Sequence, residues 1–110
     1  MRYNLLGATS LFISELSLGT MTFGASGRFE VMGSVEQSAA DLMVRRALDA
    51  GVNLIDTADA YSNGDAERVL GRALKNVGAP RERVLFATKA FDAMGDGPNQ
   101  GAAQRSARAA

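Results

Sequence analysis

The central part of the chain alternates between segments with helical spacing of apolar residues and short apolar runs. One such segment is followed by Gly78 and Pro80, which commonly end helices, and it predicts an amphipathic helix. The apolar positions of this predicted helix are Ala66, Val69, Leu70, Ala73, Leu74 and Val77.

An earlier segment has the same spacing and predicts another helix. Ser34 and Gln37 are spaced as in a capping box, which places the start of this helix near Ser34. Gly51 follows the segment, as glycine often does at a helix C-terminus. The predicted buried stripe consists of Ala39, Leu42, Met43, Ala47 and Ala50.

Two apolar runs near these helices predict strands. Val52–Ile55 lies between the helices, and Val84–Ala87 follows the second one. Both runs are apolar at successive positions, which predicts strands buried on both faces of a parallel sheet. Their separation fits a strand–helix–strand crossover of about 30 residues.

The N-terminal region predicts β-structure. Residues 3–12 form two extended pieces around Gly7-Ala8-Thr9 and predict a hairpin. Leu16 and Leu18 predict a strand that ends at Gly19-Thr20.

Two segments have no steady period. Residues 25–34 predict a loop that is rich in glycine and serine. Residues 102–110 lack large apolar residues and predict a poorly ordered tail.

Composition excludes several functions. The chain has 110 residues, enough for one domain, and its formal net charge of zero gives no electrostatic reason to expect nucleic acid or anionic membrane as a partner. It has no cysteine and no histidine, so we predict no metal site. No apolar run approaches the about 20 residues of a membrane span, and the N-terminus does not resemble a secretory signal. A soluble, cytoplasmic protein is therefore expected.

Polar side chains follow all three predicted parallel strands. Thr20 follows the first strand, Asp56 and then Tyr61 follow the second, and Lys89 follows the third. Neighbouring parallel strands lie about 4.8 Å apart, and functional groups in α/β folds gather at their carboxyl ends. We therefore expect Asp56, Tyr61 and Lys89 to lie on one rim.

These side chains suit proton donation to a carbonyl oxygen. A phenol has a pKa near 10, which an adjacent ammonium lowers, and a carboxylate would hold that ammonium in place. Tyr61 would then give a proton to the alkoxide that develops during carbonyl reduction. Each residue also has a simpler structural explanation, with Asp56 in a turn, Tyr61 in packing and Lys89 in solvent.

The run GVNLIDTADAYSNGDAERVLGRAL resembles the signature of the aldo-keto reductase family. RYNLLGATSLFISELSLGTMTFG is similar to that family's N-terminal hairpin and first barrel strand, and VLFATKAF to its third strand. DAMGDGPNQG is similar to the next loop in the branch with bacterial general-stress reductases and potassium-channel β-subunits. The resemblance covers about residues 1–101, which we interpret as a partial reductase domain.

The resemblance implies the reduction of aldehydes or ketones by an NADP-dependent oxidoreductase that uses NADPH. By motif, Tyr61 is the expected proton donor, Lys89 the partner that lowers its pKa, and Asp56 the carboxylate that orients the lysine. Thr20 and Met21 match cofactor contacts, and Asp56 would also lie against the nicotinamide ribose. The family's fourth catalytic residue, a histidine, has no counterpart because the chain contains none.

The implied fold is α/β: the N-terminal part of a (β/α)8 TIM barrel, with about three βα units and a hairpin. A full barrel takes about 250 residues, so we expect a truncated reductase that is inactive and poorly stable alone. Its open strand edge would favour self-association. Two alternatives are a non-catalytic binding or regulatory module that retains the sheet, and a chain that completes its barrel with another chain.

Overall fold

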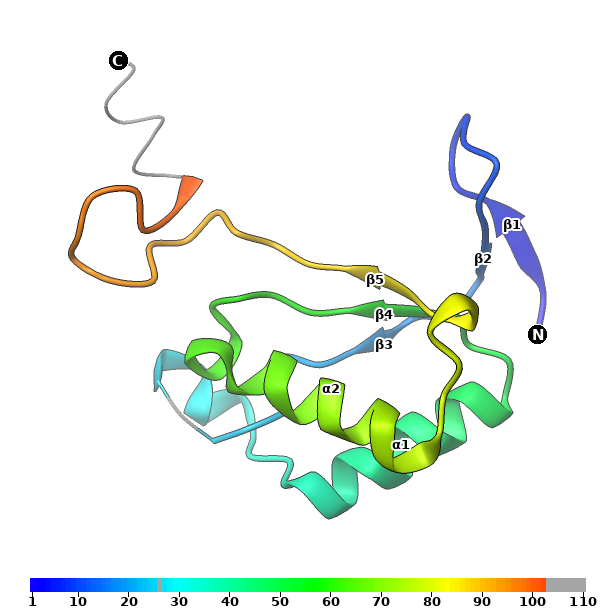
Figure 1. Cartoon of the computed structure of the whole chain (residues 1–110), viewed down its shortest axis with the longest axis horizontal. Helices are drawn as coiled ribbons and strands as arrows, with labels where there is room; N and C mark the ends of the chain where they lie inside the picture. Colours follow the sequence, from blue (N-terminus) through cyan, green and yellow to red (C-terminus); the bar gives the residue numbers. More distant parts are fainter. Residues whose placement is uncertain (26, 103–110) are drawn as a thin grey trace.

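A three-stranded parallel sheet organises the computed structural model, which describes residues 1–25 and 27–102 (Figure 1). The strand order is β3 (Leu18–Gly19), β4 (Leu54–Asp56) and β5 (Leu85–Ala87). Helix α1 (Gln37–Asp49) connects β3 to β4, and α2 (Asp65–Val77) connects β4 to β5. This confirms the predicted order of strands and helices.

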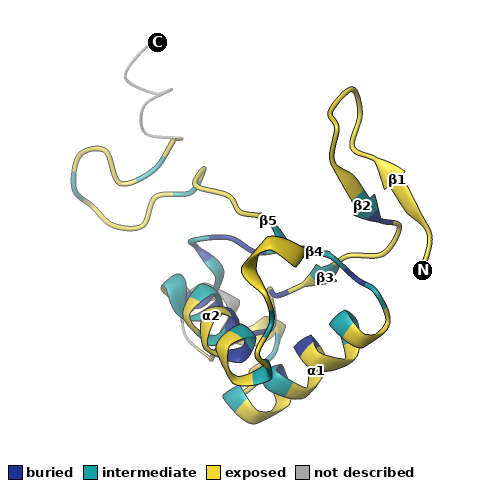
Figure 2. Cartoon of the chain, turned by 45° about the vertical axis from the view of Figure 1, so that its right-hand side comes forward, coloured by how far each residue is buried: buried dark blue, intermediate teal, exposed yellow. Residues whose placement is uncertain are grey.

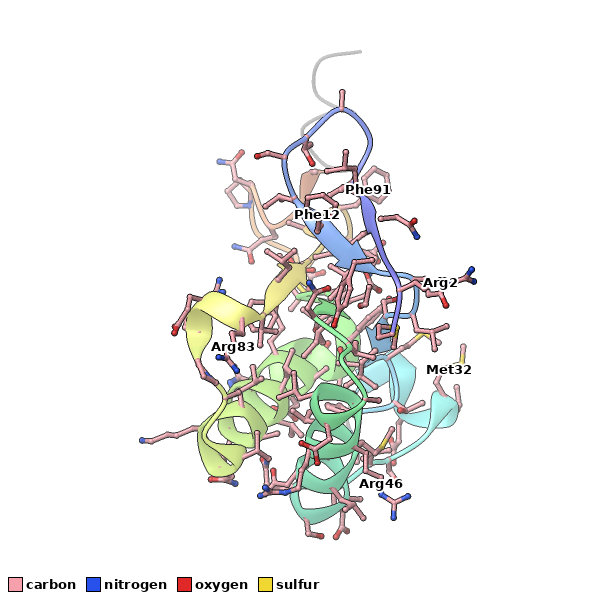
Figure 3. All side chains as sticks on the ribbon, turned by 90° about the vertical axis from the view of Figure 1, so that its right-hand side faces the viewer. Arg2, Phe12, Met32, Arg46, Arg83 and Phe91 are labelled. Atoms are coloured by element: carbon pink, nitrogen blue, oxygen red, sulfur yellow. The ribbon has the colours of Figure 1, made fainter. Side chains whose placement is uncertain are left out.

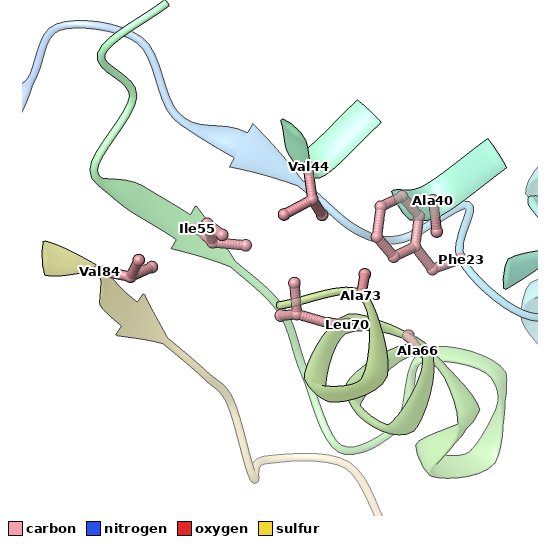
Figure 4. Close-up of a cluster of buried hydrophobic side chains, with 8 residues drawn as sticks. All are labelled: Phe23, Ala40, Val44, Ile55, Ala66, Leu70, Ala73 and Val84. Carbon is pink, nitrogen blue, oxygen red and sulfur yellow. The ribbon is translucent and has the colours of Figure 1, made fainter. Parts of the chain in front are cut away.

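Both α-helices pack on the same face of the sheet and enclose the hydrophobic core (Figures 1 and 4). Helix α2 buries the predicted face and ends at Gly78, whose φ of 70° suits glycine. Burying aliphatic side chains of this kind stabilises the fold by roughly 1.5–3 kcal/mol each. The buried core consists of Phe23, Ala40, Val44, Ile55, Ala66, Leu70, Ala73 and Val84.

Helix α1 buries a different face from the predicted one. Ala40 and Val44 are buried, whereas Leu42 and Met43 are 52% and 38% exposed. Arg46 lies one turn after the exposed pair and points outward in Figure 3. Of the other predicted stripe residues, Ala47 is half-buried, and two are exposed, Ala39 and Ala50.

Two side-chain hydrogen bonds join α1 to α2 in the observed rotation. Gln37 Nε2 donates a hydrogen bond to the carbonyl of Val69 at 3.1 Å, and Asn76 Nδ2 donates one to Asp41 Oδ2 at 2.8 Å. With this rotation, the small Ala40 is fully buried in the core that α1 shares with α2. The bonds with Gln37 and Asn76 also lower the pKa of Asp41.

The start of α1 also differs from the prediction. The helix begins at Gln37, with Glu36 as its N-cap and without a side-chain capping hydrogen bond. The predicted capping box at Ser34 is therefore wrong. The C-terminal prediction is confirmed, because Gly51 follows the helix with a φ of 91°.

The sheet face opposite the helices is not covered by either α-helix (Figures 1 and 2). Ile55 and Val84 are buried on the helix side, but their neighbours Leu54 and Leu85 are only half-buried. The predicted burial on both faces is therefore wrong for the described residues, because α1 and α2 both cover the same side.

A hairpin is present as predicted, although its second strand lies at residues 12–14 and not within the predicted range of 3–12, and it lies at the beginning of the parallel strands (Figure 1). Its antiparallel strands are β1 (Tyr3–Leu5) and β2 (Phe12–Ser14). Asn53 links the hairpin to β4, since its Nδ2 donates to the carbonyl of Phe12 at 3.0 Å and its Oδ1 accepts from Ser14 N–H at 2.8 Å.

Several boundaries differ from those predicted. Strand β3 contains only Leu18–Gly19, and Leu16 is 62% exposed. The predicted loop at residues 25–34 contains a 3-10 helix, η1 (Gly27–Met32), and further 3-10 turns are η2 (Tyr61–Gly64) and η3 (Arg81–Arg83).

Two further expectations concern the C-terminal tail and membrane-spanning helices, and the structure bears on them only within the described residues. The predicted tail at 102–110 lies outside the described residues, apart from Ala102. Among residues 1–25 and 27–102, no helix has the length and apolar character needed to cross a membrane.

Candidate active site

The carboxyl ends of β4 and β5 bring three predicted site residues together. Asp56 is the last residue of β4, Tyr61 begins η2, and Lys89 follows β5. Lys89 Nζ donates hydrogen bonds to Asp56 Oδ2 at 2.7 Å and to the phenol oxygen of Tyr61 at 3.2 Å. The prediction that they share one rim is confirmed.

A backbone carbonyl completes the surroundings of the lysine ammonium. Lys89 Nζ donates a third hydrogen bond to the carbonyl of Thr57 at 2.8 Å. An ammonium has three donors, so Asp56, Tyr61 and Thr57 together occupy all of them. The lysine is therefore held from three directions.

Backbone pairing extends past the assigned strands and holds the residues that bear these groups. Thr57 N–H donates to the carbonyl of Ala87 at 2.8 Å, and Asp59 N–H donates to that of Lys89 at 3.1 Å. The chain on either side of the lysine is thereby fixed to the segment that follows Asp56.

The electrostatic surroundings keep Lys89 protonated. Partial burial lowers the pKa of Lys89, but hydrogen bonds and charge interactions with Asp56 and Tyr61 outweigh this effect and raise the pKa above its ordinary value. The side chains of Lys89 and Asp56 are 48% and 40% exposed, so solvent screens their attraction. The ion pair therefore orients the ammonium more than it stabilises the fold.

Tyr61 serves both packing and the polar cluster. Its ring packs against the hydrophobic core, and Lys89 Nζ lies 4.9 Å from the ring centroid, within the range of a cation–π contact. The two residues that follow, Ser62 and Asn63, have left-handed φ values of 50° and 53°. Such conformations cost about 1–3 kcal/mol each and are concentrated at functional sites.

Thr20 and Met21 lie at the end of β3, as predicted, but in different surroundings. Thr20 is fully buried, and both its N–H and its hydroxyl donate to the carbonyl of Asp56, at 3.0 and 3.1 Å. Thr20 thus helps hold the strand end that carries Asp56. Met21 is 37% exposed, and a cofactor contact by either residue stays a prediction.

Sequence reasoning missed two contributors to the site. The carbonyl of Thr57 leaves no signal in a sequence, because every residue carries one. A second contact joins Thr88 to Glu67, with a distance of 2.7 Å between Thr88 Oγ1 and Glu67 Oε1. Glu67 belongs to the recognised motif, but the spacing of residues does not reveal that it faces the end of β5.

Comparisons with known proteins place these residues in a family. The sequence profile of the Aldo/keto reductase family matches residues 15–109. This chain belongs to the aldo-keto reductase family. An aldo-keto reductase of Alternaria alternata is 38% identical over 94 residues, covering 86% of this chain and 25% of the relative. A probable voltage-gated potassium channel subunit beta of Oryza sativa subsp. japonica is 37% identical, covering 90% of this chain and 28% of the relative.

Solved structures of aldo-keto reductases have the same arrangement. The holo form from Bacillus halodurans has a TM-score of 0.69 and 30% identity, with 92% of this chain and 30% of that chain covered. The enzyme from Klebsiella pneumoniae, in complex with NADPH, has a TM-score of 0.54 and 26% identity, with 73% and 25% covered. The chain spans about a quarter to 30% of these relatives' lengths, and it forms the N-terminal part of an α/β barrel, as predicted.

Proposed function

We propose that this chain supplies the proton-donating part of a reductase site that converts aldehydes or ketones to alcohols with NADPH. The observation that carries the proposal is the ammonium of Lys89, which donates to the phenol oxygen of Tyr61 while Asp56 and the Thr57 carbonyl hold it. Membership in the aldo-keto reductase family supports the assignment to the oxidoreductases.

Each side chain has a distinct part in the proposed reaction. Tyr61 gives its proton to the substrate oxygen as the carbonyl becomes an alkoxide, and the product is an alcohol. The phenolate that remains is stabilised by the adjacent ammonium of Lys89, and solvent later restores the proton. Asp56 keeps the lysine charged and oriented.

The described residues suit only one end of the cofactor. NADPH, when bound, supplies the hydride for the carbonyl carbon. Asp56 is 40% exposed beside Lys89, and Met21 is exposed at the neighbouring strand end, so both can contact the nicotinamide end. A dinucleotide needs many more contacts than these. We therefore expect the 110-residue chain alone to bind NADPH weakly and to show no useful turnover.

A chimera with a complete relative tests the proposal. Residues 1–102 would replace the matching segment of the Bacillus halodurans aldo-keto reductase, to which 92% of this chain is superimposable. We expect NADPH-dependent reduction of 4-nitrobenzaldehyde by the chimera. Tyr61→Phe should lower kcat by about 10²–10⁴-fold, because general acid catalysis contributes that much.

The other tyrosine of the chain provides the matched control. Tyr3 lies in the N-terminal hairpin, where its hydroxyl donates to the carbonyl of Gly51, and Tyr3→Phe should leave kcat within about twofold. Equal activity of the Tyr61→Phe and unmodified chimeras would contradict the assigned proton donor. Turnover by the 110-residue chain alone would show that it builds a complete site, for example by self-association.

A non-catalytic binding module is the alternative. The similarity to a probable potassium channel subunit beta favours it, because that relative's name describes a channel subunit. The same chimera separates the two functions. If the chain is a binding module, the affinity of the chimera for the cofactor should survive Tyr61→Phe. There should also be no turnover for this substitution to remove.

A further inference from the structure

The residue before Lys89 is tied to the helical layer. The hydroxyl of Thr88 donates to Glu67 Oε1 at 2.7 Å, and Glu67 lies in the first turn of α2. Lys89 itself is bound to the segment after β4. The two neighbouring residues therefore attach the end of β5 to two different parts of the fold.

The alternation of side chains explains this division. Neighbouring side chains of an extended chain point to opposite faces. Val84 and Phe86 face the core on the helix side, so Thr88 follows on that side while Lys89 projects from the open face. The bond to Glu67 therefore limits rotation of the strand end about its own axis.

Rotation at this point matters because the lysine must reach three acceptors at once. The longest of its hydrogen bonds is the 3.2 Å contact with Tyr61, against 2.7 and 2.8 Å for Asp56 and Thr57. A small rotation of the backbone would break the Tyr61 contact first. Thr88 and Lys89 are both exposed, so packing alone does not hold them.

We propose that Glu67 is a positioning residue for Lys89, acting through the hydroxyl of Thr88. The importance of this for reduction rests on the proposed function, whereas the effect on the lysine is observable without catalysis. Glu67 accepts the hydrogen bond, Thr88 holds the strand end, and Lys89 keeps its contact with Tyr61.

The composition of the chain makes the lysine directly observable. Lys75 and Lys89 are its only lysines, so Lys75→Arg leaves a single lysine side chain. With lysine labelled by 13C at Cε, an NMR titration of this background reports the pKa of Lys89 alone. We expect that pKa to lie above the ordinary value, because the contacts with Asp56 and Tyr61 outweigh the effect of partial burial.

Two pairs of substitutions test the proposal. Glu67→Ala and Thr88→Val remove the hydrogen bond and should return the pKa of Lys89 toward its ordinary value. Glu67→Gln and Thr88→Ser keep an acceptor or a donor and should retain the elevation. Glu67→Gln also removes the carboxylate charge, so it separates hydrogen bonding from simple charge attraction.

The outcomes are distinguishable. Equal changes in the pKa of Lys89 for Glu67→Ala and Glu67→Gln would assign the effect to charge and overturn the proposal. An unchanged pKa in both Glu67→Ala and Thr88→Val would overturn it as well. Amide spectra of the same samples check folding. If Glu67→Ala unfolds the chain, the Thr88→Val and Thr88→Ser pair decides the result.

The chimera provides a second readout in a complete barrel. There, Glu67→Ala should lower kcat by roughly tenfold to hundredfold with KM nearly unchanged, while Glu67→Gln retains activity. An inactive chimera with the expected NMR shifts would count against the proposed function and leave the positioning role supported. An active chimera that is insensitive to Glu67→Ala would overturn the positioning role alone.

Discussion

The two faces of the parallel sheet are formed by the same strands but differ in what covers them. On the helix side, Ile55 and Val84 are 0% and 2% exposed and pack against α1 and α2 (Figure 4). On the open side, Leu54 and Leu85 are half-buried, and Lys89 binds its partners at the carboxyl ends of the strands.

Along one strand, the residues that stabilise the fold therefore face the opposite side from the residues of the polar cluster. Residues directed toward the helices contribute the hydrophobic core, whereas the polar cluster on the open face is held by its own hydrogen bonds. Because side chains alternate, adjacent residues such as Ile55 and Asp56 belong to different environments. Substitutions at adjacent positions should therefore have very different consequences.

The largest difference is expected between Ile55→Ala and Leu54→Ala. Ile55 is fully buried, so its truncation leaves a cavity and should lower the free energy of unfolding by about 2–5 kcal/mol. Leu54 is half-buried on the open face, and its truncation should cost about 1 kcal/mol. Urea denaturation followed by circular dichroism measures both values.

Equal losses in the free energy of unfolding at these two positions would contradict the difference between the two faces. They would mean that the open face is covered in solution, as it would be if two chains associated through it. Sedimentation of the unmodified 110-residue chain would then identify the association directly.

Substitutions of two buried threonines at the strand ends should change the free energy of unfolding by smaller amounts and in opposite directions. Thr20 donates its hydroxyl to the carbonyl of Asp56, whereas the buried hydroxyl of Thr57 has no hydrogen-bond partner among the described residues. Thr20→Val should therefore lower the free energy of unfolding by about 1 kcal/mol, and Thr57→Val should raise it by a similar amount. Thermal unfolding of both variants checks the signs, and a loss for Thr57→Val would show that its hydroxyl is satisfied in solution.

The smallest effect is the pH dependence contributed by Lys89. Its pKa is raised in the folded chain, so its contribution to stability is complete below the ordinary value of 10.5 and is lost as pH rises through the folded value. Because the side chain is half-exposed, we expect less than about 1 kcal/mol. The urea midpoint should change less between neutral pH and about pH 11 in Lys89→Met than in the Lys75→Arg control. Equal changes in the two variants would refute this contribution of Lys89.

The sequence alone determined the order of strands and helices and the residues of the polar rim. Helix α2 was predictable because its apolar residues form a single stripe bounded by Gly78. Asp56, Tyr61 and Lys89 were predictable because each lies at or after the carboxyl end of a recognisable strand, and the carboxyl ends of parallel strands share one edge. The motif around Asp56 is by itself enough to indicate the family.

The tertiary structure alone decided which face of α1 is buried and what covers the sheet. Helical spacing supports both the Ala40–Val44 stripe and the Leu42–Met43 stripe, and the charged residues one turn after the latter, Arg45 and Arg46, were the local sign that it faces solvent. The contacts of the Thr57 carbonyl and Glu67 likewise depend on segments distant in sequence. The physical reason is that periodicity describes a surface, whereas burial and hydrogen bonding depend on the second surface that packs against it.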